Sequence, residues 1–257
     1  MAGVIASERN IHILRQINAR GVINLKEVAR ELGTSETTIR RDFEKLERLG
    51  KLKRVQGGAT LHDDAPESAQ LAMREKRAIS AGEKQEVARC ASLLVKDGDS
   101  VFLDCGTSLV PLAELLLPRP VKIVTTNTLL VNLPGSARAA VFLVGGQYHS
   151  HYNMTYGPLA KEILERFSFN HVFIGCFGVS LEQNRAFTLE VDSMQMKLAA
   201  MRNAERKHLL LDGSKLFRAG FYAFAELSLF DTVFCDSFPQ GQPVPSNLRL
   251  PGMPFGA

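Results

Sequence analysis

Apolar residues recur with helical spacing in the first fifty residues of the chain. One set falls at i, i+3, i+4 and i+7 and so predicts one buried face of a short helix: Leu25, Val28, Ala29 and Leu32. Asn24 and Glu27 can start this helix in the manner of a capping box, and Gly33 can give it a left-handed end. The pattern therefore predicts a helix of about two turns.

The helix that follows has its own apolar face and its own caps. Its core positions are Ile39, Phe43, Leu46 and Leu49. Thr34 and Ser35 can cap its start, and Gly50 ends it. An opening helix, ended by Gly21, precedes both and has one apolar face: Ile11, Leu14 and Ile17. Together these segments predict a three-helix unit, with Val22-Ile23 as a short strand.

The side of the second helix that lies opposite Ile39 is polar and basic. At about 100° per residue it carries Thr37, Arg41, Glu44 and Arg48, flanked by Arg40 and Lys45. Hydroxyls in the first turn can hold phosphates, and a guanidinium can bind guanine through two hydrogen bonds. This is typical of a helix that enters the major groove of DNA. A merely solvated, charged helix face is the alternative.

A basic segment and a glycine pair follow this helix. Lys51, Lys53 and Arg54 precede Gly57-Gly58, where a sharp turn would fold the chain back as a small wing with further DNA contacts. The predicted DNA-binding residues are Ser35, Thr37, Thr38, Arg40, Arg41, Lys45, Arg48, Lys53 and Arg54. Residues 1–61 contain 12 Lys and Arg against 7 Asp and Glu, a net charge of +5, whereas the whole chain has +4. The basic charge is therefore local, and a polyanion is expected to bind this part.

From Ser100 onward the pattern changes to short apolar runs that end in polar residues or glycine. The runs that predict strands are 101–103, 121–124, 141–144, 171–174, 208–211 and 232–235. Helical segments lie between several of them: 109–117, 159–166 and 194–204. Buried strands that alternate with helices predict an α/β fold with a largely parallel sheet.

Ligands bind such sheets at the carboxyl ends of the strands, and several of these ends carry the same kinds of residue. The strand ends are Asp104-Cys105-Gly106-Thr107-Ser108, Thr125-Thr126-Asn127, Gly145-Gly146, Gly175 with Gly178, and Asp212-Gly213-Ser214-Lys215. Glycine lets a ligand approach the backbone, hydroxyls and helix-start amides donate hydrogen bonds, and Lys can neutralise a phosphate. Each alone can be an ordinary strand-to-helix turn. Their repetition favours a phosphate-binding site.

Other features of the composition exclude several classes of protein. The longest apolar runs fall short of the roughly 20 residues of a membrane span, and the N-terminus lacks the features of a signal peptide, so a cytoplasmic protein is expected. Cys90, Cys105, Cys176 and Cys235 are widely spaced. They indicate neither a disulfide framework nor a zinc site, and we expect no metal and no cofactor.

The segment TIRRDFEKLERLGKLKRVQGGATL resembles the DeoR-type winged helix-turn-helix of bacterial sugar-catabolism repressors. FLDCGTS, TTNT, FLVGG, YGPLA, FIG-x-x-G, the stretch from Glu190 to Lys197, and D-G-S-K resemble the DeoR C-terminal sensor domain. That domain is similar in fold to ribose-5-phosphate isomerase and the CoA transferases. The two resemblances cover roughly residues 8 to 236.

The resemblance implies a non-catalytic site for a phosphorylated sugar or a related metabolite. The positions that match the family's ligand-binding motifs are Asp104, Gly106, Thr107, Ser108, Asn127, Gly146 and Lys215. The chain departs from the family where Cys176-Phe177 replaces the usual Ala-Asp, where D-G-S-K-L replaces D-S-S-K-F, and where LEQNRAFT lacks a Gly before the Thr. These departures leave open an altered or an absent effector.

The sequence thus predicts four parts. They are a winged helix-turn-helix domain (1–61), a linker with the start of a connecting helix (62–82), a phosphosugar-sensing α/β domain (83–238) and a Pro- and Gly-rich tail (239–257). The connecting helix is expected over 69–95, and a short strand in the tail near 248–250. The predicted function is a sequence-specific, DNA-binding transcriptional repressor of a carbohydrate-catabolism operon.

The expected partners are a double-stranded DNA operator, a phosphorylated sugar, and further copies of the chain in a homodimer or homotetramer. Two alternatives stay open. One is a phosphosugar isomerase or transferase with a DNA-binding appendage, for which Asp104, Glu190 and Asp212 are available as bases. The other is an architectural DNA-binding protein without ligand control.

Overall fold

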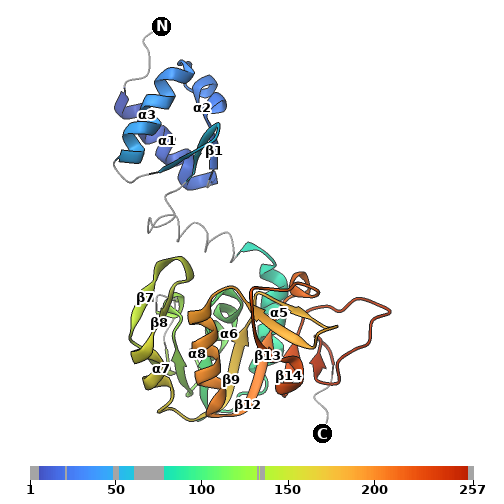
Figure 1. The fold of residues 1–257 in the computed structure, drawn as a ribbon. Helices are drawn as coiled ribbons and strands as arrows, with labels where there is room; N and C mark the ends of the chain where they lie inside the picture. The colour runs from blue at the N-terminus through green and yellow to red at the C-terminus, as the bar shows by residue number, and fades with distance from the viewer. Residues whose placement is uncertain are drawn as a thin grey trace. The chain divides into compact units, whose positions relative to one another are not determined.

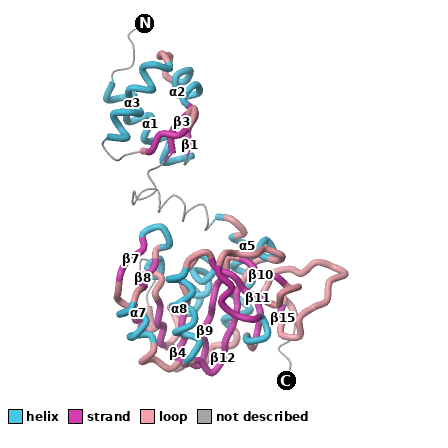
Figure 2. Tube along the Cα trace, viewed as in Figure 1, coloured by secondary structure: helices cyan, strands magenta, loops and turns pink. Residues whose placement is uncertain are grey.

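The computed structural model describes residues 6–20, 22–48, 52–60, 78–131, 133 and 137–253. The chain divides into two compact units, residues 1–76 and 77–257, each with its own core (Figures 1 and 2). Most of the predicted linker, residues 62–77, lies outside the described residues. The boundaries of the linker therefore stay a prediction.

The described part of the N-terminal unit contains three helices and a three-stranded antiparallel sheet (Figure 1). The helices are α1 (Ala6–Arg20), α2 (Leu25–Glu31) and α3 (Glu36–Arg48). The strands are β1 (Val22–Asn24), β2 (Lys53–Val55) and β3 (Gly58–Thr60), in the order β1-β3-β2. This confirms the winged helix-turn-helix fold, and β2 and β3 form the wing.

Asn24 and Ser35, which were predicted to cap α2 and α3, form these caps in the structure. The Asn24 side chain accepts hydrogen bonds from the backbone N–H groups of Lys26 and Glu27, at 2.9 and 3.4 Å. Ser35 Oγ accepts one from the Thr38 N–H at 3.2 Å, which satisfies a donor in the first turn of α3. Local side-chain chemistry therefore sets where both helices begin.

The core of this unit is made from residues of all three helices and the sheet: Ile13, Ile17, Ile23, Leu25, Val28, Ala29, Ile39, Phe43, Leu46, Leu52 and Ala59. The prediction for α1 was wrong at one position. Ile11 is 52% exposed, and Ile13 takes its place in the core together with Ile17. Ile13 and Ile17 are four residues apart, so they stack one turn above the other on the face that packs against α2 and α3.

The C-terminal unit is built on a seven-stranded sheet in the order β15-β14-β12-β9-β4-β5-β6, in which all neighbouring strands run parallel. The strands are β4 (Ser100–Leu103), β5 (Lys122–Thr125), β6 (Ala140–Leu143), β9 (Phe169–Gly175), β12 (Ala204–Leu210), β14 (Thr232–Phe234) and β15 (Leu248–Arg249). The six apolar runs of the α/β half and the short strand in the tail are thus confirmed. The fold is a parallel α/β fold.

Helices cover both faces of this sheet. α5 (Ala81–Ser92) and α6 (Val110–Leu116) pack on one face around Val101, Leu103 and Phe173. α7 (Pro158–Leu164) and α8 (Val191–Arg202) pack on the other face around Phe102 and Ile174 (Figure 1). Burial on both faces explains why the central strands β4, β5 and β9 read as nearly continuous apolar runs. The edge strand β6 is apolar as well, but all four of its residues are exposed.

Two antiparallel additions were not predicted. β10 (Gly178–Ser180), β11 (Arg185–Thr188) and β13 (Tyr222–Glu226) form a second sheet, and β7 (Gln147–His149) pairs with β8 (Met154–Tyr156). The described part of the expected connecting helix over 69–95 is also not continuous. Ser80 has a left-handed backbone, with φ 51° and ψ 42°, and α5 begins at the next residue. None of the helices in the described ranges is both long and apolar enough to span a lipid bilayer.

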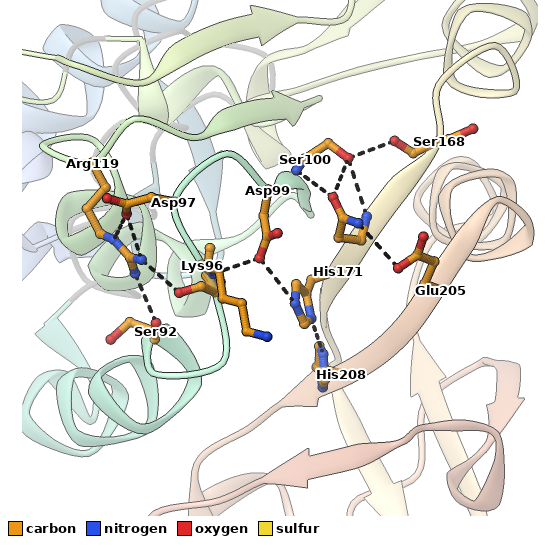
Figure 3. A network of polar contacts seen from close by, with 12 residues as sticks. Ser92, Lys96, Asp97, Asp99, Ser100, Arg119, Ser168, His171, Glu205 and His208 are labelled. Atoms are coloured by element: carbon orange, nitrogen blue, oxygen red, sulfur yellow. Dashed lines mark hydrogen bonds and ion pairs between the residues drawn. The ribbon is translucent and has the colours of Figure 1, made fainter.

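A chain of polar contacts joins Asp99, in the loop before β4, to His171 of β9 and His208 of β12 (Figure 3). His171 Nδ1 and His208 Nε2 are 2.9 Å apart, and His171 Nε2 lies 3.5 Å from Asp99 Oδ2. The His208 side chain is 2% exposed, and its ring stacks on Phe173 with a centroid separation of 4.9 Å. Burial, and to a lesser extent repulsion from His171, lowers the pKa of His208 to about 3.

This buried imidazole predicts acid sensitivity. His208 stays neutral in the folded protein but takes up a proton below about pH 6.5 once the chain unfolds. Its contribution to stability is therefore present above pH 6.5 and is lost as the pH falls toward 3. Between pH 7 and pH 5 this amounts to about 2 kcal/mol.

Urea unfolding of the wild type and of His208→Phe at these two pH values measures the effect. The wild type should lose more of its free energy of unfolding on acidification than the variant does. Equal losses in the two proteins would show that His208 does not control the acid sensitivity.

Candidate DNA-binding surface and effector site

The basic residues of α3 lie on its exposed side. Arg40, Arg41, Lys45 and Arg48 are all exposed, as is Thr37. Among the described residues, the side chains of Arg40, Arg41 and Lys45 make neither hydrogen bonds nor ion pairs. Three cations on one helix are therefore available to an external anion. The Arg48 side chain donates weakly to the Glu44 carbonyl, at 3.4 Å.

Arg54 of the wing has a different environment. Its Nε lies 2.7 Å from Glu47 Oε2, its Nη1 lies 2.8 Å from Glu44 Oε1, and its backbone N–H donates to Glu47 Oε1 at 2.9 Å. These contacts tie the wing to α3. The geometry assigns Arg54 a structural role beside the predicted role in DNA binding, which stays a prediction, as does that of Lys53.

Asp42 also positions α3, and its role was missed in the sequence. Its carboxylate is nearly buried and accepts two hydrogen bonds from Arg9 of α1, at 2.8 and 3.2 Å. The pair is bidentate and part-buried, which is the strongest geometry for an Arg–carboxylate contact. It fixes the rotation of α3 and therefore the direction in which Arg40 and Arg41 point. Thr38 and Ser35, also predicted to bind DNA, bond to each other through their hydroxyls at 2.9 Å.

In the C-terminal unit the predicted ligand residues other than Gly146 converge around the end of β4. The Asp104 carboxylate is fully buried, and its Oδ2 accepts a hydrogen bond from the Gly175 N–H at 3.0 Å and an ion pair from Lys197. Its Oδ1 is buried and has no partner among the described residues. Burial alone would lower the pKa of Lys197, but the Asp104 carboxylate outweighs it and raises that pKa, so Lys197 is an ammonium. Lys197, on α8, is a site residue that sequence reasoning missed.

Two further lysines reach the hydroxyls that follow Gly106. Lys215 Nζ donates to Ser108 Oγ at 2.7 Å and lies 3.3 Å from Asp212 Oδ2. Lys84 Nζ, from α5, lies 3.4 Å from Thr107 Oγ1. Lys84 was also missed, because it precedes β4 and belongs to no strand end.

The electrostatic balance of this cluster favours an anion. The cluster contains the ammonium groups of Lys84, Lys197 and Lys215. Their partners are the carboxylates of Asp104 and Asp212 and the hydroxyls of Thr107 and Ser108. The pKa of Lys84 is lowered by burial first and then by repulsion from Lys215. Burial would raise the pKa of Asp212, but Lys215 and its hydrogen bonds lower it. A bound phosphate would relieve the repulsion between the two lysines.

Asn127 supports the loop of the candidate site, whereas Gly146 does not belong to the cluster. Asn127 Nδ2 donates to the Asp104 and Gly106 carbonyls, at 3.3 and 3.0 Å, and Asn127 Oδ1 accepts from the Leu129 N–H. Its amide thus holds the loop that carries Thr107 and Ser108. Gly146 packs elsewhere: a Cβ there would lie 2.5 Å from the Tyr156 carbonyl oxygen. Its predicted contact with a ligand stays a prediction.

The two cysteines of these loops serve packing. Burial raises the pKa of Cys105 to about 12 and that of Cys176 to about 11, so both are thiols at neutral pH. Neither is a ready nucleophile. Phe177, next to Cys176, stacks under the Arg218 guanidinium, whose carbon lies 3.9 Å from the ring centroid.

A winged helix-turn-helix unit with free cations on its third helix, and a parallel α/β unit with lysines at its strand ends, define a DNA-binding regulator with a separate sensor domain. Comparison with known proteins gives the family. Residues 9–65 match the DeoR-like helix-turn-helix domain, and residues 79–237 match the DeoR C terminal sensor domain. The chain belongs to the DeoR family of transcriptional regulators, as its sequence predicted.

The chain also resembles individual members along nearly its whole length. It is 30% identical over 232 residues to the lactose phosphotransferase system repressor of Streptococcus mutans. This alignment covers 89% of this chain and 91% of that protein. It is 28% identical over 233 residues to the protein of the same name in Staphylococcus epidermidis, with 90% and 92% covered.

Two solved structures align with parts of the chain. Ribose 5-phosphate isomerase A of Methanocaldococcus jannaschii has a TM-score of 0.39 at 20% identity and covers 53% of this chain and 55% of that one. The full-length sorbitol operon regulator SorC of Klebsiella pneumoniae has a TM-score of 0.33 at 15% identity and covers 80% and 89%.

The buried pair of Asp104 and Lys197 predicts a large cost when one partner is removed. In Asp104→Asn the Lys197 ammonium is left buried without a counter-charge, and the free energy of unfolding should fall by about 3–5 kcal/mol. Asp97→Asn is the control. Asp97 pairs with Arg119 at 3.0 Å but is 64% exposed, so its loss should cost at most about 1 kcal/mol.

Urea unfolding of the two variants decides between the expectations. Equal and small losses would mean that the pair does not hold the sensor domain together.

Proposed function

We propose that this protein is a cytoplasmic repressor of a carbohydrate-catabolism operon and that a phosphorylated sugar bound at the end of β4 controls it. The observation that carries the proposal is the convergence of Lys84 and Lys215 on the hydroxyls of Thr107 and Ser108, close to the pair of Lys197 and Asp104. Membership of the DeoR family and the similarity to lactose phosphotransferase system repressors support it. The unpaired cations of α3 supply the contacts to the operator.

The arrangement favours sensing over catalysis. An isomerase needs a carboxylate that is free to accept a proton from the sugar. Asp104 is paired with Lys197, Glu190 accepts a hydrogen bond from Tyr152 at 2.9 Å, and Asp212 contacts Lys215 and Ser214. Each candidate base is thus held by a donor, which supports a binding site without turnover.

The proposal includes a homodimer or homotetramer. One winged helix reads only a few base pairs, so affinity at physiological salt requires two half-sites. Effector binding would change the spacing of two DNA-binding domains, and the segment that leads into α5 would carry that change.

A thermal-shift screen tests the effector. Phosphorylated sugars and sugar alcohols are added to the wild type, Lys215→Ala and Thr107→Ala, with Lys122→Ala at the exposed start of β5 as a control. The right compound should stabilise the wild type and the control by about 2.7 kcal/mol at 100 times its Kd. It should stabilise Lys215→Ala and Thr107→Ala far less, because both lose an anion contact. A panel without any shift would contradict control by a phosphosugar.

Operator binding tests the role of α3. If Arg41 reads a base, Arg41→Ala should weaken operator binding by about 1–3 kcal/mol and flatten the preference among sequences. Arg41→Lys is the matched control, since it keeps the positive charge but cannot form the bidentate hydrogen bonds of a guanidinium with a base. Binding measured on operator and random DNA distinguishes the outcomes. An equal loss on both DNAs in Arg41→Ala, restored by Lys, would make Arg41 a phosphate contact.

A further inference from the structure

Lys84 connects the candidate effector site to the point where the chain enters the sensor domain. Its side chain lies in the first turn of α5 and is only 6% exposed, which is rare for lysine. The ammonium donates to the Ile79 carbonyl at 2.6 Å and reaches Thr107 Oγ1 at 3.4 Å. One cation therefore contacts both the loop that would bind phosphate and the segment just before α5.

That segment has a strained turn. Ser80 adopts φ 51° and ψ 42°, a left-handed conformation that costs energy for a residue with a Cβ, and its side chain makes no capping bond to α5. The turn is held by Lys84 instead: the Lys84 N–H donates to the Ser80 carbonyl at 3.0 Å, and its ammonium holds Ile79. The strain persists because Lys84 supports the turn from two sides.

An anion would compete for the same ammonium. A carbonyl is a neutral acceptor, whereas a phosphate oxygen is charged and forms a stronger bond with ammonium. Each of the Thr107 and Ser108 hydroxyls contacts one lysine, Lys84 or Lys215, so an anion bound at these hydroxyls would lie within reach of both ammonium groups.

We propose that Lys84 is a ligand of the effector's phosphate and that the bond from its ammonium to the Ile79 carbonyl is the contact through which binding is transmitted. When the anion binds, Lys84 turns toward it and releases Ile79, and the left-handed turn at Ser80 relaxes. This rests on the proposed function, because it takes the anion site at Thr107 and Ser108 as given. The turn at Ile79 and Ser80 is then the element with two states that coupling between the two sites requires.

Hydrogen exchange of the full-length protein, with and without inorganic phosphate, tests the mechanism. We expect phosphate to raise the thermal stability and, at the same time, to speed amide exchange in residues 79–84 about tenfold, the effect of losing one hydrogen bond to a charged group. Phosphate that stabilises the protein but leaves exchange in 79–84 unchanged or slower would overturn this inference and leave the proposed site intact. Absence of any stabilisation would overturn both.

Lys84→Gln gives a second measurement, with Lys96→Gln as the matched control, because Lys96 is exposed beyond the far end of α5. In Lys84→Gln, residues 79–84 should exchange fast without phosphate and should not respond to it, and phosphate affinity should fall about tenfold. Lys96→Gln should behave as the wild type. A Lys84→Gln protein that keeps the wild-type response would overturn the inference, and the wild-type experiment stands if the variant does not fold.

Discussion

The sensor domain depends on one buried carboxylate. Asp104 ends β4, and through its Oδ2 it holds the backbone of Gly175 at the end of β9 and the ammonium of Lys197 on α8. Three elements that are far apart in the sequence therefore meet at one oxygen atom. A charge at this depth is tolerable only with such partners, so the position of the loop after β4 is fixed by electrostatics. Thr107 and Ser108 lie in this loop, so their position is fixed as well.

The N-terminal unit also contains a nearly buried carboxylate that is paired with a cation. Asp42 is nearly buried beneath the exposed face of α3, and Arg9 satisfies both of its oxygens. Arg40 and Arg41, which precede Asp42 directly, are consequently presented from a helix that cannot rotate. In both units a buried carboxylate determines where the neighbouring cationic groups lie. Removal of this carboxylate would therefore displace the cationic groups and also lower the stability of the unit.

The sequence predicted the parts of the structure that local pattern controls. The six apolar runs became six strands, most of them covered on both faces, and the caps at Asn24 and Ser35 act within three residues of themselves. Lys84 and Lys197 could not be found in this way, since they reach the site from helices 23 and 93 residues away from their partners in the chain. The short antiparallel strands β10, β11 and β13 were missed for a related reason: their pairing is set by contacts across the chain and not by a run of apolar residues.

The replacement of the family's usual Ala-Asp by Cys176-Phe177 changes the charge of this region. Phe177 gives Arg218 an aromatic surface in place of a carboxylate, and the guanidinium stacks on it at 3.9 Å. Stacking leaves the N–H donors of a guanidinium free, whereas a carboxylate would occupy two of them. Among the described residues, the exposed side chain of Arg218 makes no hydrogen bond or ion pair. Under the proposed function, an effector would meet one negative charge fewer near Cys176, which would favour an anion.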